Sequence, residues 1–220
     1  MIKKPLLPRQ ILRMPGQEGV GTEENMARDA CVNRKTKETN IQMNLTLDGS
    51  GKASVATGIG FFDHMLEGFA KHGLFDLSVS IMGDLGVDGH HTVEDAGIVL
   101  GQAIAQAVGD KKGIKRYGHF LLPMDDALVL CAVDLCGRPW LNFDYQFPTQ
   151  MIGNLDTQLI REFFYAVSYS AGMNLHIKVL DGFNSHHVAE AMFKAFAKAL
   201  DMATQKDERI KDVLSTKGAL

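Results

Sequence analysis

The sequence is poor in cysteine and lacks both long apolar runs and long basic runs. Its three cysteines are too few and too scattered for a disulfide framework, which predicts a protein of the reducing cytoplasm. No segment approaches the ~20 apolar residues of a membrane span, so no membrane partner is predicted. The net charge is −3, and without a basic run no nucleic-acid partner is predicted either.

What is present is a large apolar fraction. The chain has 220 residues, of which 45% are hydrophobic, enough for a sizeable core in one or two domains. Residues 1–30 differ from the rest, with three prolines followed by glycines and acidic residues. They lack the apolar stretch of a signal peptide, and we predict that they form a loosely ordered lead-in.

A doubled motif, His-His-x-x-Glu, is the strongest chemical signal. It occurs at His90, His91 and Glu94 and again at His186, His187 and Glu190, each copy 96 residues from the other. On a helix these three side chains gather on one face, and two imidazoles with a carboxylate suit Mn, Fe, Co or Zn ions. One copy would more often cap or pack a helix, but the repeat indicates a duplicated unit that carries metal ligands twice.

The rest of the chain fits the same duplication. The first half predicts a strand near 31–47, a hairpin partner at 52–57, a helix at 61–73, a strand at 76–82 and a helix at 90–108. The second half predicts a strand at 127–135 with 140–145 pairing back, a helix at 155–171, a strand at 173–180 and a helix at 186–204. Each half is therefore hairpin, helix, strand, helix.

This order predicts an α+β fold made of an internally duplicated unit, with two-layer arrangements of sheets packed on helices. The pseudo-repeats span about 31–112 and 113–208, and a tail follows at 209–220. Aligning the middle helices at their glycine ends places His64 opposite Glu162. The candidate metal ligands are then His64, His90, His91, Glu94, Glu162, His186, His187 and Glu190.

The chain resembles the imidazoleglycerol-phosphate dehydratase family in segments that run in order from residue 31 to the C-terminus. These segments are Arg34-x-Thr36-x-Glu38-Thr39, Phe62-Asp63-His64-Met65, His72-Gly73-x-Phe75-Asp76, Asp88-x-His90-His91-Thr92-Val93-Glu94-Asp95, Arg116-Tyr117-Gly118, Pro123-Met124-Asp125, Asp134-x-x-Gly137-Arg138, Asn184-Ser185-His186-His187-x-x-Glu190, Phe193-Lys194-Ala195 and Ser215-Thr216-Lys217-Gly218. The resemblance identifies residues 31–220 as a dehydratase domain.

The resemblance implies a lyase of histidine biosynthesis, which dehydrates D-erythro-imidazole-glycerol phosphate to imidazole-acetol phosphate. It implies a hollow homo-oligomer of 24 subunits and two manganese ions per active site, shared between subunits. It divides the ligands into His90, Glu162, His186 and Glu190 around one ion, and His64, His91, Glu94 and His187 around the other. Two positions depart from many relatives, which carry His at Glu162 or Gln at Gly68.

Two metal ions suit this reaction because the substrate has no carbonyl next to the C–H bond that breaks. Ions on both ring nitrogens of the substrate imidazole would stabilise an imidazolate near neutral pH. That electron-rich ring expels the hydroxyl from the attached carbon, and a base then removes the neighbouring proton.

The resemblance also supplies roles for residues away from the ions. Glu38 is the predicted base, with Glu190 as the rival, because a proton-transfer group lies near the metals. Cationic and hydroxyl donors that bind the phosphate are predicted at Arg116, Arg138, Lys194, Ser215 and Lys217. Asp63, Asp88 and Asp95 are candidates for orienting the histidine rings.

Two other classes of protein use similar ligands. A dinuclear hydrolase of phosphate esters would bridge its ions with water, about 3.5–4 Å apart. A non-catalytic metal-binding shell would need the ligands but neither Glu38 nor the cationic residues. Turnover of the imidazole substrate separates both from the dehydratase.

Overall fold

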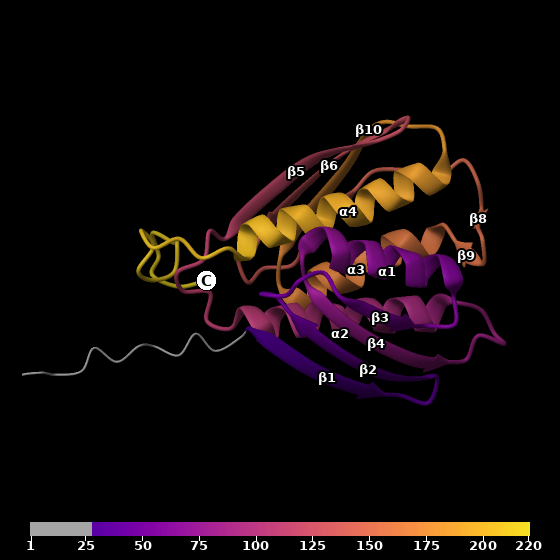
Figure 1. Cartoon of the computed structure of the whole chain (residues 1–220), viewed down its shortest axis with the longest axis horizontal. Coiled ribbons are helices and arrows are strands. Elements are labelled where there is room, and N and C mark those ends of the chain that lie inside the picture. Colours follow the sequence, from indigo (N-terminus) through magenta and orange to yellow (C-terminus); the bar gives the residue numbers. More distant parts are fainter. Residues whose placement is uncertain (1–27) are drawn as a thin grey trace, which may run out of the picture.

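The computed structural model describes residues 28–220 (Figure 1). Residues 1–27, and with them nearly all of the predicted lead-in, lie outside the described residues. The first half contains β1 (Asp29–Lys35), β2 (Thr39–Thr46), β3 (Ala53–Ala56), α1 (Gly60–Gly73), β4 (Asp76–Gly83) and α2 (His90–Val108). The second half contains β5 (Tyr117–Met124), β6 (Ala127–Asp134), β7 (Trp140–Phe143), α3 (Gln158–Ala171), β10 (Asn174–Asp181) and α4 (Ser185–Thr204), with the short pair β8 (Met151–Ile152) and β9 (Leu155–Asp156) inserted before α3.

The two sheets have the same topology, which confirms the predicted duplication. The first has the strand order β1-β2-β4-β3 and the second β5-β6-β10-β7. In both, the first three strands in that order pair antiparallel and the last strand runs parallel to its neighbour. A helix connects each parallel pair, α1 between β3 and β4 and α3 between β7 and β10.

The predicted hairpins were wrong in both halves, and for the same reason. The stretch 31–47 is not one strand, because the side chain of Thr36 accepts hydrogen bonds from the backbone N–H groups of Glu38 and Thr39 and turns the chain between β1 and β2. Thr36 and Glu38 therefore lie in this turn. The glycine-rich loop after Leu47 instead leads to β3, which pairs with β4.

In the second half the prediction missed β5, which forms the hairpin with β6. The strand that was expected to pair back on β6, β7, runs parallel to β10 instead. A turn signal shows that the chain changes direction but does not specify the neighbouring strand, which the helix connection decides here.

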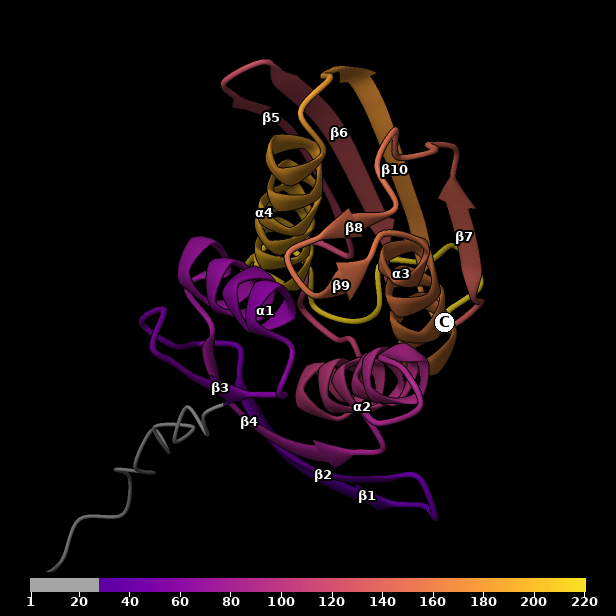
Figure 2. The same ribbon diagram turned by 90° about the vertical axis from the view of Figure 1, so that its right-hand side faces the viewer.

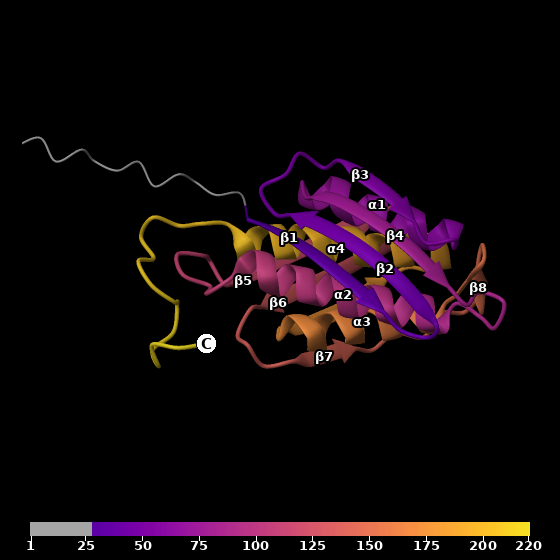
Figure 3. The same ribbon diagram turned by 90° about the horizontal axis from the view of Figure 1, so that it is seen from below.

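The four helices lie between the two sheets, and Figure 2 shows them nearly end-on. Figure 3 shows the first sheet from the outside, with the helices behind it. The halves meet helix to helix. Gly97 and Gly101 of α2 let the backbone of α3 approach closely, since a Cβ at Gly97 would lie 2.7 Å from the carbonyl oxygen of Phe163. Phe69 of α1 stacks on Phe196 of α4, with ring centroids 5.4 Å apart.

All four helices begin at the same end of the molecule, on the right in Figure 1. A Cβ at Gly89, just before α2, would lie 3.0 Å from Ile59 and 3.3 Å from Leu159, which stand at the starts of α1 and α3. The ring of Phe61 in α1 lies 5.1 Å from that of His186 in α4. The first turns of all four helices are therefore neighbours.

Two smaller observations concern composition. Cys131 and Cys136 are buried, as expected of small core residues, and burial raises the pKa of the Cys131 thiol. Among the helices of residues 28–220, none combines the length and apolar character that crossing a membrane requires.

Close packing of β5 on α4 gives a test of the fold. A Cβ at Gly118 would lie 1.8 Å from the carbonyl oxygen of Ala199, so Gly118→Ala forces a backbone shift and should lower the free energy of unfolding by about 1–3 kcal/mol. Denaturant unfolding at fixed protein concentration measures it. Gly68→Ala is the control, because a Cβ there meets no atom within 4 Å; equal stability of the two variants would contradict this packing.

Candidate active site

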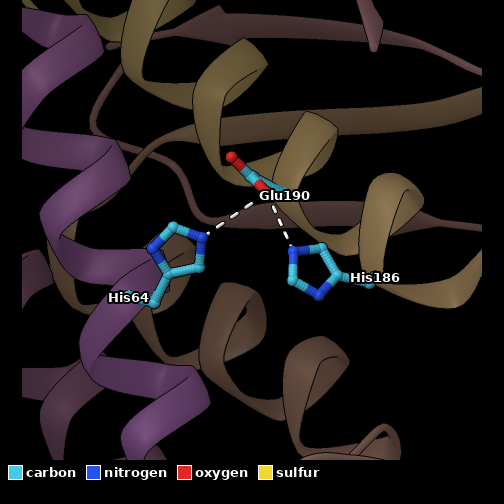
Figure 4. A group of neighbouring side chains, drawn as sticks. All are labelled: His64, His186 and Glu190. Carbon is cyan, nitrogen blue, oxygen red and sulfur yellow. Dashed lines mark hydrogen bonds and ion pairs between the residues drawn. The ribbon is translucent and has the colours of Figure 1, made fainter. Parts of the chain in front are cut away.

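Three predicted ligands meet where α1 faces α4 (Figure 4). The Nε2 atoms of His64 and His186 lie 3.5 Å and 3.0 Å from Oε2 of Glu190. One ligand atom from each residue lies within 4.8 Å of the other two, a spacing that could hold a metal ion. Both histidine side chains remain about half exposed, whereas that of Glu190 is only 12% exposed. The donor set therefore fits a divalent transition ion.

The carboxylate of Glu190 also has a cationic neighbour. Its Oε1 lies 2.7 Å from Nζ of Lys194, one helical turn further along α4. Burial acts to raise the pKa of Glu190, but Lys194 and His186 outweigh it and lower that pKa. Glu190 is thus held ionised, with one oxygen toward the imidazoles and the other toward the ammonium group.

The equivalent residues of the first half lie where α2 faces α3. His90 Nε2 is 3.7 Å from Glu94 Oε2, and His90 shares a cavity of about 680 Å³ with Glu162 and Asp88. Glu162 is partly exposed and accepts a hydrogen bond from Arg161. The structure thus brings together His90, Glu94 and Glu162 at one place and His64, His186 and Glu190 at another.

The second histidine of each motif points in a different direction. The rings of His90 and His91 are nearly perpendicular, at 85°, and those of His186 and His187 stand at 80°. Nδ1 of His91 is 3.0 Å from Asp84, and Nδ1 of His187 is 2.5 Å from Asp126. Each contact occupies Nδ1 and leaves Nε2 available as a ligand atom.

Sequence reasoning missed both of these aspartates. Asp126 lies 61 residues from His187, so no local spacing indicates the contact. Backbone N–H groups of Asn184 and Phe183, together with the His187 ring, hold the pKa of Asp126 far below its usual range. The hydrogen bond that the His91 ring donates to Asp84 raises the pKa of His91.

The three aspartates that were expected to orient rings bond elsewhere. Asp63 accepts hydrogen bonds from the backbone N–H and hydroxyl of Thr57. Asp88 accepts the backbone N–H of His90 rather than a ring proton. Asp95 binds Arg34 and the Thr39 hydroxyl, which fixes α2 on its sheet.

Glu38 lies at the same end of the molecule as the ligands. The β1–β2 turn carries its carboxylate to 4.0 Å from Nε2 of His91, and its side chain is 53% exposed. The turn between β5 and β6 has the equivalent place in the second half, where Asp125 lies 3.5 Å from Nε2 of His187. An acidic turn therefore stands beside the second histidine in both halves.

Four of the five predicted phosphate-binding residues line one cavity of about 580 Å³: Arg116, Arg138, Ser215 and Lys217. Asp134 binds Nε and Nη2 of Arg116 and raises its pKa, and Nη1 donates to the Leu214 carbonyl. The fifth residue, Lys194, lies away from this cavity at Glu190.

The cavity and the ligands lie at opposite ends of the helices. The backbone N–H of Arg116 bonds to the carbonyl of Ala203 at the end of α4, whereas His186 stands at its start. The rise of an α-helix puts roughly 25 Å between those two positions. One chain therefore presents a metal-binding end and a basic end.

The fold and these two ends define a class of protein: a duplicated α+β protein with a candidate metal site and a separate cavity lined by basic residues. Comparison with known proteins makes the class specific. Residues 57–200 match the family profile described as "Imidazoleglycerol-phosphate dehydratase". The curated protein of that name from Lachnoclostridium phytofermentans is 64% identical over 89% of this chain and 100% of its own length, and that from Acetivibrio thermocellus is 60% identical over the same shares.

Solved structures similar to this chain belong to the same family. The imidazoleglycerol-phosphate dehydratase of Staphylococcus aureus superposes with a TM-score of 0.74 at 36% identity, over 81% of this chain and 99% of its own. That of Pyrococcus furiosus, solved in complex with (S)-C348, gives 0.75 at 36% identity, over 86% and 100%. The chain belongs to the imidazoleglycerol-phosphate dehydratase family, hydro-lyases of histidine biosynthesis. This decides against the hydrolase and the non-catalytic shell.

The Asp126–His187 contact gives a test of ligand positioning. Asp126→Asn should lower the affinity of the protein for Mn²⁺ by about 10–100-fold, the usual cost of losing a residue that orients a ligand. Titration of the metal-free protein measures this independently of turnover. The control is Asp144→Asn, whose side chain is 87% exposed and, within residues 28–220, pairs only with Lys178. Unchanged affinity in the Asp126 variant would show that His187 needs no such support.

Proposed function

We propose that this chain dehydrates D-erythro-imidazole-glycerol phosphate to imidazole-acetol phosphate with the help of two divalent ions, Mn²⁺ first among them. The observation that carries the proposal is the set of imidazole and carboxylate donors at the helix starts, three of which already lie within 4.8 Å of one another. The eight residues that would hold the ions are His64, His90, His91, Glu94, Glu162, His186, His187 and Glu190. When bound, such ions act as Lewis acids that favour loss of the substrate's ring N–H.

A residue of the chain itself, Glu38, would remove the substrate's C–H proton. Glu38 stands 4.0 Å from Nε2 of His91 and is half exposed, so it borders the ligand cluster yet can reach a substrate. We assign it the removal of the C–H proton next to the departing hydroxyl. Glu190, the rival base, is held by two imidazoles and Lys194, which suits a ligand better than a proton acceptor.

The basic cavity binds the phosphate. Asp134 fixes the Arg116 guanidinium, and two of its five N–H donors remain for phosphate oxygens. Arg138, Ser215 and Lys217 add donors from the same cavity. Because the tail supplies Ser215 and Lys217, its closure over the phosphate would also exclude water from the reacting carbon.

One chain cannot supply the whole site. The substrate spans roughly 10 Å at ordinary bond lengths, whereas roughly 25 Å of helix α4 separates His186 from the residue that contacts Arg116. We therefore infer that the metal-binding end of one copy meets the basic end of another. This inference supports a homo-oligomer, for which the resemblance to the family implies 24 subunits.

We also propose that the protein works in the cytoplasm, where the free thiol of Cys31 would stay reduced.

Glu38 gives the first test of this proposal. Glu38→Gln keeps the side chain's size and removes its basicity, so turnover of the imidazole substrate should drop at least ~10²-fold. Bound Mn²⁺ should stay at the wild-type level, because Glu38 is not a ligand. Glu67→Gln, on the exposed side of α1, is the control. Near-normal turnover of the Glu38 variant would transfer the role to Glu190.

Mixed oligomers test the shared site. Glu38→Gln removes the proposed base at the metal-binding end and Arg138→Ala weakens the basic end, so each variant alone should be poorly active. Co-expressed chains should recover about a quarter of wild-type activity, since random assembly pairs intact ends. Mixtures no more active than the separate variants would place each site within a single chain.

A further inference from the structure

His64 and Glu162 hold equivalent places in the two halves of the molecule. His64 is the fifth residue of α1 and Glu162 the fifth residue of α3, and these helices occupy the same position in the duplicated topology. At the other ligand positions the halves match, with His90 and His186, His91 and His187, and Glu94 and Glu190. The duplication is thus broken at one ligand pair only.

The two residues also lie at different places. His64 stands with His186 and Glu190 between α1 and α4. Glu162 lines the cavity of His90 and Asp88 between α2 and α3, and His64 does not line that cavity. The two side chains therefore face different parts of the ligand cluster.

The composition of the ligand set prevents the two ions from having identical sets of ligands. The eight ligands are five imidazoles and three carboxylates, and an odd number of each cannot be shared equally by two ions. If each ion takes four, one receives three imidazoles and one carboxylate, and the other receives two of each. His64 lies with His186 and Glu190, whereas Glu162 lies near His90, which contacts Glu94. If each ion also takes one of the two remaining histidines, His64 belongs to the ion with three imidazoles and Glu162 to the ion with two carboxylates.

Building on the proposed function, we propose that the two ions are chemically unequal: an imidazole-rich site that includes His64 and a carboxylate-rich site that includes Glu162. Imidazole suits Zn²⁺ and similar ions, whereas carboxylate suits Mn²⁺. The carboxylate-rich site also carries one more negative charge. The protein should therefore exchange Mn²⁺ for Zn²⁺ in two separate steps, first at the site of His64.

Competition between Mn²⁺ and Zn²⁺ tests this in the full-length protein. The Mn²⁺-loaded protein is equilibrated against rising free Zn²⁺, and both metals retained per chain are counted by mass spectrometry. Half of the Mn²⁺ should leave in an early step and half in a later one, with midpoints separated by about tenfold or more. Electron paramagnetic resonance of the remaining Mn²⁺ should change between the two steps.

Two single variants should remove the difference between the ligand sets of the two ions, and a double variant should restore it. Glu162→His gives each ion three imidazoles and one carboxylate, so both ions should exchange together in one early step. His64→Glu gives each ion two imidazoles and two carboxylates, so both should exchange together in one late step. The double variant His64→Glu with Glu162→His swaps the residues and should restore two steps. Sedimentation of each variant checks that it assembles as the wild type does.

The outcomes separate this inference from the function on which it rests. A single step in the wild-type protein, or two unchanged steps in Glu162→His, overturns the inequality while leaving two bound ions and the dehydratase mechanism intact. A protein that retains no ions after loading with Mn²⁺ or Zn²⁺ overturns the proposed metal centre itself. Either result is read from metal content without measuring activity.

Discussion

Helix-to-helix packing between the two halves is the constraint on which the site depends. Gly97 and Gly101 allow α2 and α3 to approach closely, and the stacked rings of Phe69 and Phe196 join α1 to α4. This packing aligns four helix starts at one end of the molecule. Every candidate ligand lies near the start of a helix, so side chains from four separate elements meet without a loop having to fold around them. A rigid scaffold of this kind suits a metal centre, because ligand positions must be held within fractions of an ångström.

The duplication explains the geometry of the second histidines. In each half, one sheet's hairpin turn reaches the second histidine of the motif, with Glu38 near His91 and Asp125 near His187. Asp84 and Asp126 then hold Nδ1 of these rings. The aspartates that bond to these rings come from different segments: Asp84 from a loop before α2 and Asp126 from the β5–β6 turn. What is repeated is the position of the ring rather than the residue that fixes it.

Under the proposed function, the separation of the two ends makes self-association a requirement for catalysis. A chain that carries its ligands at the helix starts and its basic cavity beyond the helix ends cannot bind both ends of a small substrate by itself. A site built from two copies is also shielded from water only when they are assembled. The proposed function thus couples activity to assembly, because an isolated chain would lack the basic cavity of a second copy beside its own candidate metal ligands.

The sequence by itself determined the helices and the residue types of the candidate ligands. The span of α2 was predicted at 90–108 and is His90–Val108, because apolar periodicity and the residues at helix ends act locally. The two motifs at a shared spacing likewise determined the duplication and the donor types. These signals lie within a few residues of one another, so they can be read without knowing the fold.

Tertiary structure alone decided which segments became neighbours. The glycine-rich loop after Leu47 gave a turn signal, yet β3 pairs with β4, because α1 carries the chain back across the sheet. Asp126 became the support of His187 across 61 residues, while Asp63, Asp88 and Asp95, closer in sequence to other histidines, bond elsewhere. The distance between Arg116 and the ligands also depends on how α4 is placed. Contacts of this kind follow from packing between distant elements, which no local pattern of residues encodes.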